Sequence, residues 1–402
     1  MGDLVRRWVG AIQWLPTRPL FSLDRTEDCL KILLLIYIPA LIASYSYMIG
    51  PKAGPDFAAY WAAGKLVWID AAKSYDRSAL AGLQDWFPST KAQPFVNPPP
   101  LLFVVAPFGL LAFPAALIAW AVVTVSVFAF VFRRSIGLWT TLASPALLIN
   151  VGIGQGGLLT GGLLIGAMTQ LKQRPLLAGA LAGCMVIKPQ LALLLPVALI
   201  AGGYWRTILV AAATAAGLLA LSYFAFGPAT FAAFLKTVGQ QTSVWRDARL
   251  LVLMQSPLAF VLHFTGNWLA AVAIQLSIAL GAAVVVFATW LRRDLEIAAK
   301  AAVLLSASAL ATPYAYPHDE VLLLLPIVWL AREGRRLGYR AWEPWVVVAA
   351  FASPLLFTYI APRTGLNLAL FAHLALFAAV VRRALHPSVR RPMGTAPAAL
   401  PA

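Results

Sequence analysis

The chain has 402 residues, of which 61% are hydrophobic and only 11% are charged. This composition excludes a soluble enzyme, because about a quarter of the residues of a soluble domain are charged. Between clusters of charged residues, apolar runs recur with the roughly 17 to 25 residues that cross a bilayer as a helix. Such runs also exclude an outer-membrane barrel, whose strands alternate between apolar and polar residues. The sequence therefore predicts an all-α, polytopic integral membrane protein.

The formal net charge of +16 is best explained by membrane topology. Most of the 31 Lys and Arg residues fall in short clusters between apolar runs, and such clusters mark the cytoplasmic side of a membrane protein. We therefore expect both termini in the cytoplasm and no nucleic acid partner. The apolar runs of spanning length predict about twelve transmembrane helices.

The charge clusters divide the chain into three parts. They are a cytoplasmic segment 1–29, an integral membrane domain 30–388 and a disordered cytoplasmic tail 389–402. Three loops then lie on the outer face, at residues 51–98, 227–266 and 312–320.

Two stretches have unusual patterns. From Phe57 to Ile69 the apolar residues recur at helical spacing, which predicts a helix in the plane of the membrane surface within the first outer loop. Residues 99–132 are too long for one straight span and contain Pro107 and Pro114. They form either one broken crossing or a crossing plus a re-entrant piece.

Asp56 stands just after the outer end of the first predicted helix, in the run Gly54-Pro55-Asp56-Phe57. As a helix N-cap, its carboxylate would accept the free backbone N–H groups of the first turn. As a general base at the membrane surface, it would take a proton from a reacting hydroxyl. The two roles are compatible, because a cap also fixes the orientation of a carboxylate. Asp76 is expected to be a second cap or part of a local ion pair.

Lys188 is flanked by long apolar runs, where a charge is costly and is a functional candidate. It either snorkels to the outer interface from a helix end broken by Pro189 or contacts a phosphate. His318 and Asp319 stand together in the third outer loop, where such a pair is either merely polar or part of a site.

No pattern for a structural metal or a nucleotide is present. Cys29 and Cys184 lie far apart and lack the spacing of a disulfide framework or a zinc site. The glycines from Gly152 to Gly162 lack a Walker lysine and a preceding strand. Close helix packing is their expected role.

The segments that carry a family resemblance run in order from about residue 54 to residue 330. They are the run Gly54 to Gly64 around Asp56, Asn97-Pro98-Pro99-Pro100, Asn150 to Gly157 around Gln155, Lys188-Pro189, and Ala311-Thr312-Pro313-Tyr314. In this order they resemble the polytopic glycosyltransferase family 87, and most closely its proteobacterial branch.

The resemblance implies a GT-C-type helical bundle and a donor in which a sugar, expected to be mannose, is linked to polyprenyl phosphate. It also implies a carboxylate of the first outer loop as catalytic base, and this role falls on Asp56. No metal or other cofactor is expected, because a monophosphate can leave without one. The residues expected to bind substrate are Tyr60, Trp61, Asn97, Gln155, Lys188, His318 and Asp319.

The resulting expectation is an inverting hexosyltransferase of the bacterial inner membrane. It would transfer the sugar from its polyprenyl-phosphate donor to a hydroxyl of a lipid or glycan acceptor at the periplasmic face. Two other classes stay open. One is a transporter or flippase for the lipid, in which Lys188 grips a headgroup phosphate without covalent chemistry. The other is a structural partner in a cell-envelope complex.

Overall fold

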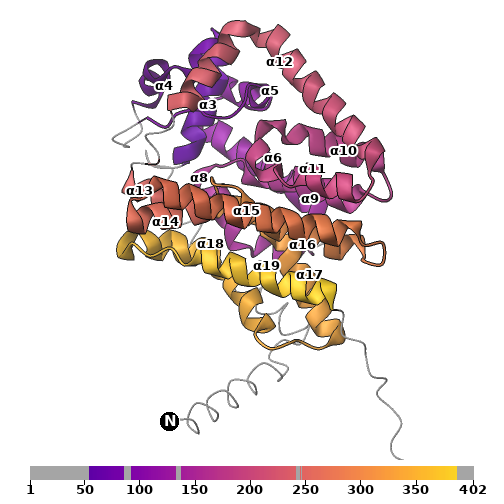
Figure 1. Ribbon diagram of the computed structural model, residues 1–402. Coiled ribbons are helices and arrows are strands. Elements are labelled where there is room, and N and C mark those ends of the chain that lie inside the picture. The colour runs from indigo at the N-terminus through magenta and orange to yellow at the C-terminus, as the bar shows by residue number, and fades with distance from the viewer. Residues whose placement is uncertain (1–53, 86–91, 133–136, 241–244, 246, 387–402) are drawn as a thin grey trace, which may run out of the picture.

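The computed structural model is a bundle of helices packed around a buried apolar centre (Figure 1). It describes residues 54–85, 92–132, 137–240, 245 and 247–386. Within these ranges every regular element is a helix and no strand occurs, which confirms the all-α class. The first predicted transmembrane helix, the segment 1–29 and the tail 389–402 lie outside the described residues.

Three helices in the described ranges are long and apolar enough to cross a membrane: α6 (Phe113–Phe132), α12 (Trp205–Gln240) and α15 (Trp268–Leu291). A fourth, α18 (Glu343–Thr364), bends by 66° between Leu356 and Thr358. α12 is kinked at Gly227, whose positive φ of 79° suits glycine. The other apolar helices are shorter. The count of about twelve crossings is therefore not confirmed and stays a prediction.

Among the described residues, five short helices precede α6: α3 (Pro55–Val67), η2 (Ala71–Tyr75), α4 (Arg77–Gln84), α5 (Pro100–Val105) and η3 (Ala106–Leu110). The expected helix of the first loop exists as α3, but its apolar side chains pack inside the protein and not against lipid, as those of an interfacial helix would. Every residue of α3 from Phe57 to Gly64 is buried, because η2, α5 and η3 pack around it. A Cβ on Gly64 would lie 2.3 Å from the carbonyl oxygen of Val105, so this packing requires glycine.

Residues 99–132 contain one continuous candidate span and a shorter piece, whose expected re-entrant course stays a prediction. The short piece formed by α5 and η3 precedes the continuous span α6. Pro107 lies in η3, and Pro114 lies in the first turn of α6, where a missing N–H costs little. The Pro-rich start therefore does not interrupt the crossing.

The central part of the chain contains α7 (Leu138–Leu142), α8 (Pro145–Ile153), α9 (Gly157–Gln170), α10 (Pro175–Gly183), η4 (Cys184–Ile187), η5 (Pro189–Ala192) and α11 (Leu195–Ala201). Lys172, just before α10, and Ile200, in α11, line the same cavity, which shows that the chain reverses between them, at Lys188. Residues 175–201 thus form a helical hairpin with Lys188 at its tip. Gly179 and Gly183, one turn apart, let α10 approach the backbone of α12 closely.

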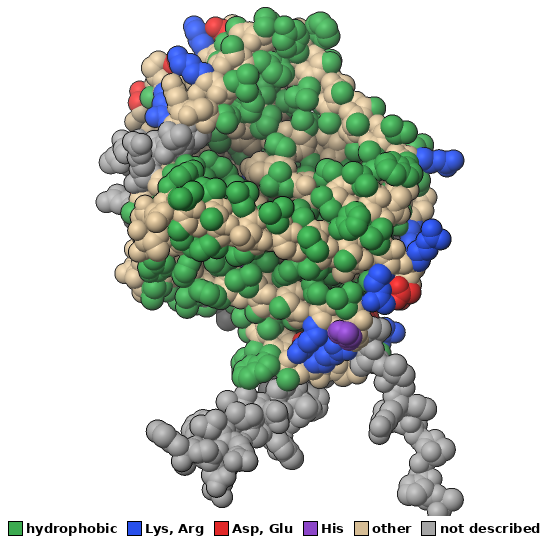
Figure 2. Space-filling view, viewed as in Figure 1, with side chains coloured by type: hydrophobic (Ala, Val, Ile, Leu, Met, Phe, Trp, Pro, Cys, Tyr) green, Lys and Arg blue, Asp and Glu red, His purple; other side chains and the backbone are tan. Residues whose placement is uncertain are grey.

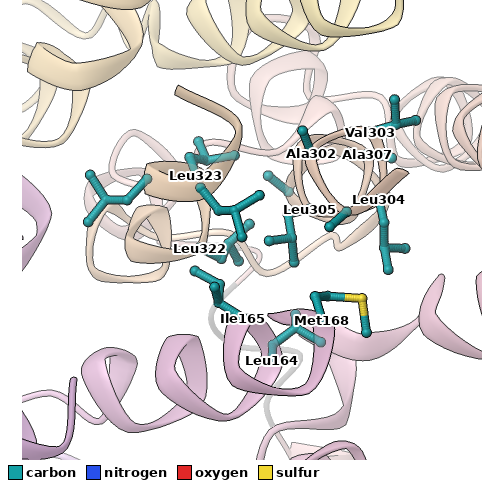
Figure 3. Packing of buried hydrophobic residues seen from close by; sticks show 14 of the residues in the cluster. Leu164, Ile165, Met168, Ala302, Val303, Leu304, Leu305, Ala307, Leu322 and Leu323 are labelled. Atoms are coloured by element: carbon teal, nitrogen blue, oxygen red, sulfur yellow. The ribbon is translucent and has the colours of Figure 1, made fainter. Parts of the chain in front are cut away.

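The C-terminal part contains α13 (Ala248–Leu251), α14 (Pro257–Thr265), α16 (Ile297–Ala311), η7 (Pro317–Leu323), α17 (Leu324–Leu337) and α19 (Ala369–Leu385). Figure 3 shows how the largest apolar cluster joins it to the central part: Leu164, Ile165 and Met168 of α9 face leucines of η7 and α16. Gly157 and Gly161 permit this contact, since a Cβ on Gly157 would lie 2.3 Å from the carbonyl oxygen of His318. The packing role expected for the glycine cluster is confirmed at these positions.

Hydrophobic side chains cover the middle of the face shown in Figure 2, while one group of Lys and Arg lies toward the edge where α15 ends and α12 begins and a second, mixed with acidic side chains, lies near α4. The loops after α9, α11 and α15 meet at this edge around one cavity. Close by, the buried Arg383 pairs with Glu343 at the start of α18. We call this end of the bundle the basic end. The segments that carry the candidate site lie at the other end of α9.

Candidate active site

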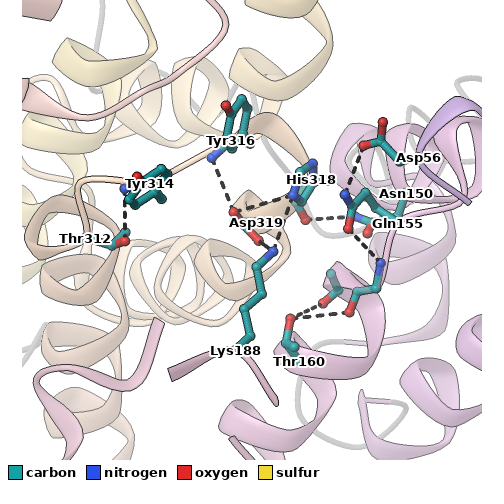
Figure 4. A network of polar contacts seen from close by, with 12 residues as sticks. Asp56, Asn150, Gln155, Thr160, Lys188, Thr312, Tyr314, Tyr316, His318 and Asp319 are labelled. Atoms are coloured by element: carbon teal, nitrogen blue, oxygen red, sulfur yellow. Dashed lines mark hydrogen bonds and ion pairs between the residues drawn. The ribbon is translucent and has the colours of Figure 1, made fainter. Parts of the chain in front are cut away.

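Asp56 lies in the first turn of α3, and its carboxylate points into the bundle toward α8 and α9 (Figure 4). Its Oδ2 accepts a hydrogen bond of 2.9 Å from Nε2 of Gln155. The other oxygen, Oδ1, has no hydrogen bond to any described residue. The expectation that Asp56 caps α3 is wrong, because Gly54 with φ 64° takes that position and Pro55 begins the helix. Asp76, by contrast, is a cap as expected and accepts the N–H of Ala79.

Gln155 occupies the turn between α8 and α9 and connects Asp56 to its surroundings. While its Nε2 donates to Asp56, its Oε1 accepts the hydroxyl of Tyr60 at 2.7 Å and the N–H of Gly156 at 3.1 Å. Gly154, with φ 73°, ends α8 in the left-handed conformation that this turn needs. Both polar atoms of the Gln155 amide are thus engaged within the protein.

Lys188, at the tip of the hairpin, is buried with only 8% of its surface exposed. Its Nζ lies 2.5 Å from Oδ1 of Asp319 and 3.3 Å from Nε2 of His318. The snorkelling interpretation is therefore wrong, since the ammonium turns into the protein. An ammonium has three donors, and two of them meet these partners.

His318 and Asp319 reach Lys188 from η7. Asp319 also accepts the N–H of Tyr316 through Oδ2, at 3.3 Å, which holds the start of η7 in place. The carbonyl oxygen of His318 accepts a hydrogen bond of 2.8 Å from the buried Asn150, and its ring stacks on Tyr316 with an angle of 8° between the planes. The pair is thus fixed by α8 and by its own helix.

A small cavity of about 10 Å³ lies beside Lys188 and is lined in part by Tyr60, Asn97 and Gly156. It has room for about one water molecule. No group of three or more His, Cys, Asp or Glu side chains placed to hold a metal ion occurs among the described residues.

Comparison with known protein families matches residues 95–313, more than half of the chain, to the profile described as glycosyltransferase family 87. The chain belongs to this family. No curated protein and no solved structure matches it. Since the family consists of glycosyltransferases, the protein is a transferase of the membrane, and the transporter and structural alternatives lose their support.

The match to glycosyltransferase family 87 covers Asn97, Gln155 and Lys188, whereas Asp56 and the His318-Asp319 pair lie on either side of it. The fold brings these parts together, because the Gln155 amide holds Asp56 and Lys188 holds Asp319.

In this family 87 protein, burial shifts the pKa values of Asp56 and His318 in opposite directions. Burial raises the pKa of the Asp56 carboxyl above its usual value, although the hydrogen bond from Gln155 and the charge of Lys188 lower it in part. Burial lowers the pKa of His318 to about 4, so the ring is neutral at pH 7. A neutral ring with its proton on Nδ1 can accept the Lys188 N–H at Nε2.

Trp61 is the one expected substrate contact that the structure places elsewhere. Its indole N–H donates 2.9 Å to the carbonyl oxygen of Leu111, and its ring packs on Phe113. Tyr60, on the next face of α3, lies at the site through Gln155. Asn97 lies beside Tyr60 on the small cavity.

Two residues of the site stand in segments that carry the family resemblance but were given no role from the sequence. Asn150 is buried and holds the backbone of His318, and its signal was a lone amide within the apolar run before Gly152. Tyr316 stacks on His318, and its signal was an aromatic residue directly before Pro317. Both residues contact His318 and help to fix its position.

Proposed function

We propose that this protein transfers a hexose from a polyprenyl-phosphate donor to a hydroxyl of a lipid or glycan acceptor, with inversion at the anomeric carbon. Mannose is the proposed hexose. The observation that carries the proposal is the Asp56 carboxylate. One of its oxygens is held by Gln155, and the other has no hydrogen bond to a described residue. A carboxylate held in this way is oriented and still has a basic atom for a substrate.

In this reaction the acceptor oxygen attacks the anomeric carbon and forms the new C–O bond. Asp56 takes the hydroxyl proton, a general-base contribution of about 10²- to 10⁴-fold. The bond between the anomeric carbon and the phosphate oxygen breaks on the opposite face, and polyprenyl phosphate leaves with the electron pair. Attack opposite the leaving group inverts the configuration.

Lys188 and His318 are the proposed contacts of the departing phosphate. Lys188 has one N–H beyond those directed at Asp319 and His318, so the phosphate shares this cation with Asp319. The neutral His318 ring adds a donor without a second charge. Such contacts are stronger in a site that excludes water. Tyr60 and Asn97 are proposed to contact the sugar.

The reaction is placed at the periplasmic face of a bacterial inner membrane. Support comes from the gathering of Lys and Arg at the basic end, which the positive-inside rule assigns to the cytoplasm. The candidate site lies at the other end, and its donor lipid enters laterally from the bilayer. The proposed chemistry uses no metal or other cofactor, and nucleic acid is not a proposed partner.

The decisive experiment replaces Asp56 by Asn and follows single-turnover transfer from a radiolabelled lipid-linked sugar by the purified protein. Asp56→Asn retains an oxygen for Gln155 but loses basicity, so we expect transfer to fall by at least about 10²-fold. Folding should not suffer. A carboxyl with a raised pKa costs stability once it is ionised, so the melting temperature at pH 7 should stay equal or rise.

Asp76→Asn is the matched control, because Asp76 is an exposed cap in the same part of the chain. It should keep parental activity. Transfer by Asp56→Asn at the parental rate would remove Asp56 from the mechanism.

A further inference from the structure

A second cavity, of about 350 Å³, lies at the basic end, across the length of α9 from Lys188. Its volume is within the range of small-molecule sites, roughly 300 to 1,000 Å³. Three cations from three different segments line it: Lys172 after α9, Arg293 after α15 and Lys300 in α16. The proposed transfer reaction uses none of them.

Lys300 is built into the wall of this cavity and is only 7% exposed. Its Nζ donates 3.0 Å to the carbonyl oxygen of Trp290, and the indole N–H of Trp290 donates 3.1 Å to the carbonyl oxygen of Lys300. These two hydrogen bonds fix the position of the Lys300 ammonium. An ammonium has three donors, so two of them remain for another partner.

The acidic residues nearby do not neutralise the cavity. Asp294 is close enough to Lys300 to attract its charge. The carboxylate of Asp294, however, accepts hydrogen bonds from Nε and Nη2 of Arg292. Lys172 and Arg293 are exposed and form no ion pair with a described residue. No acidic residue of the described chain lines the cavity, so its lining carries a net positive charge although Asp294 and Glu296 lie close by in the chain.

The cavity also lies at the ends of two candidate membrane spans. The candidate span α12 begins at Trp205 and α15 ends at Leu291, while Tyr204 and Trp290 line the cavity wall. The first residue of α12, Trp205, exposes 60% of its surface, and an exposed tryptophan at the end of a span is typical of the level of lipid headgroups. At the rim, Ile200 and Leu291 expose 49% and 53% of their surface. An apolar rim thus adjoins the cationic interior.

We propose that this cavity binds the phosphate headgroup of an anionic phospholipid. Lys172, Arg293 and Lys300 surround the phosphate, and the acyl chains lie along Ile200 and Leu291. Basic pockets between membrane helices bind anionic headgroups in this way. The apolar rim favours a lipid over free phosphate, because a soluble ion gains nothing from Ile200 or Leu291.

The test compares two double variants of the full-length protein purified in detergent. Lys172→Gln with Arg293→Gln removes two cations from the cavity and retains the buried Lys300. Arg174→Gln with Arg206→Gln removes the same charge from neighbouring exposed positions that do not line the cavity. The melting temperature is followed while phosphatidylglycerol, phosphatidylcholine or inorganic phosphate is added, since a ligand of the folded state stabilises it by mass action.

We expect phosphatidylglycerol to stabilise the parent and the control variant, and to bind the cavity variant on the order of tenfold more weakly. Phosphatidylcholine and inorganic phosphate should have little effect. Equal binding of phosphatidylglycerol to the two double variants would overturn the site. Stabilisation by inorganic phosphate as strong as that by phosphatidylglycerol, lost only in the cavity variant, would overturn the lipid as its occupant.

Discussion

Asp56 is held by one hydrogen bond in surroundings that act against its charge. Burial raises the pKa of its carboxyl, and the donor Nε2 of Gln155 lowers that pKa in part by stabilising the charged form. A general base works only when it is ionised. Activity should therefore be lost as the pH falls through the pKa of Asp56, and this loss should begin above the usual range for an aspartate.

The Gln155 hydrogen bond makes this pH dependence testable. Gln155→Leu removes the donor, so the pKa of Asp56 should rise and the acid limb of the transfer rate should move to higher pH. The measurement is the pH profile of single-turnover transfer for the parent and the variant. Gln170→Leu, at the far end of α9, is the control and should keep the parental limb. An unshifted limb in Gln155→Leu would show that Asp56 is not the group that titrates.

The sequence predicted several of these residues as members of one polar site. Asp56, Lys188 and His318 stand out because a charged or polar group in an apolar chain needs a partner. The pattern could not show that Gly54 and Pro55 begin α3 before Asp56, which leaves the carboxylate free of capping. Nor could it show that the Trp61 indole bonds to the backbone of Leu111, because that contact depends on the path of η3.

At the scale of elements, α3 is positioned by two glycines. A Cβ on Gly109 of η3 would lie 2.3 Å from the backbone of Gly64 and Lys65, and a Cβ on Gly64 would meet Val105 at the same distance. Backbone atoms cannot move aside as a flexible side chain can. The position of Asp56 therefore depends on a contact about two turns away from it along α3.

Gly109→Ala should destabilise the protein by about 1 to 3 kcal/mol, because the added methyl group overpacks this contact. Transfer should fall as well, since α3 carries Asp56. The matched control is Gly82→Ala in α4, where a Cβ meets no atom within 4 Å and alanine favours the helix by roughly 0.5 to 1 kcal/mol. Melting temperatures and transfer rates check both variants. Equal melting temperatures would contradict the packing argument.

The helical elements themselves were largely predictable, but their lengths were not. Apolar runs predicted helices throughout the membrane domain, and α6 and α15 are as long as a crossing requires. The run around Lys188 resembles a span by composition, yet it folds back as the hairpin 175–201. A run of apolar residues fits a buried short helix as well as a lipid-facing long one, so its length alone does not distinguish them.

At the scale of the whole molecule, the two ends of the bundle differ in charge and in chemistry. The basic end holds Lys172, Arg293 and Lys300 around the second cavity. The other end holds Asp56 and the Lys188–Asp319 pair. The sequence predicted this separation from the spacing of its charge clusters, although the cavity itself depends on three loops that meet only in the fold.

This polarity predicts which end is labelled from outside the cell. Single cysteines are placed at two exposed positions, Asp85 after α4 and Gln173 after α9, in a chain whose Cys29 and Cys184 are replaced by alanine. A membrane-impermeant maleimide should modify position 85 in intact cells whose outer membrane is permeabilised. Position 173 should react only after lysis. The reverse pattern would invert the proposed orientation.

The hairpin 175–201 sets how deep the site lies. Each of its two legs has thirteen residues and is roughly 20 Å long at 1.5 to 2.0 Å per residue. The hydrocarbon layer is about 30 Å thick. A hairpin that starts at the boundary of the basic end therefore stops about 10 Å short of the opposite surface. In the proposed orientation, Lys188 would then lie within the thickness of the bilayer, deeper than the plane at which lipid phosphates ordinarily lie.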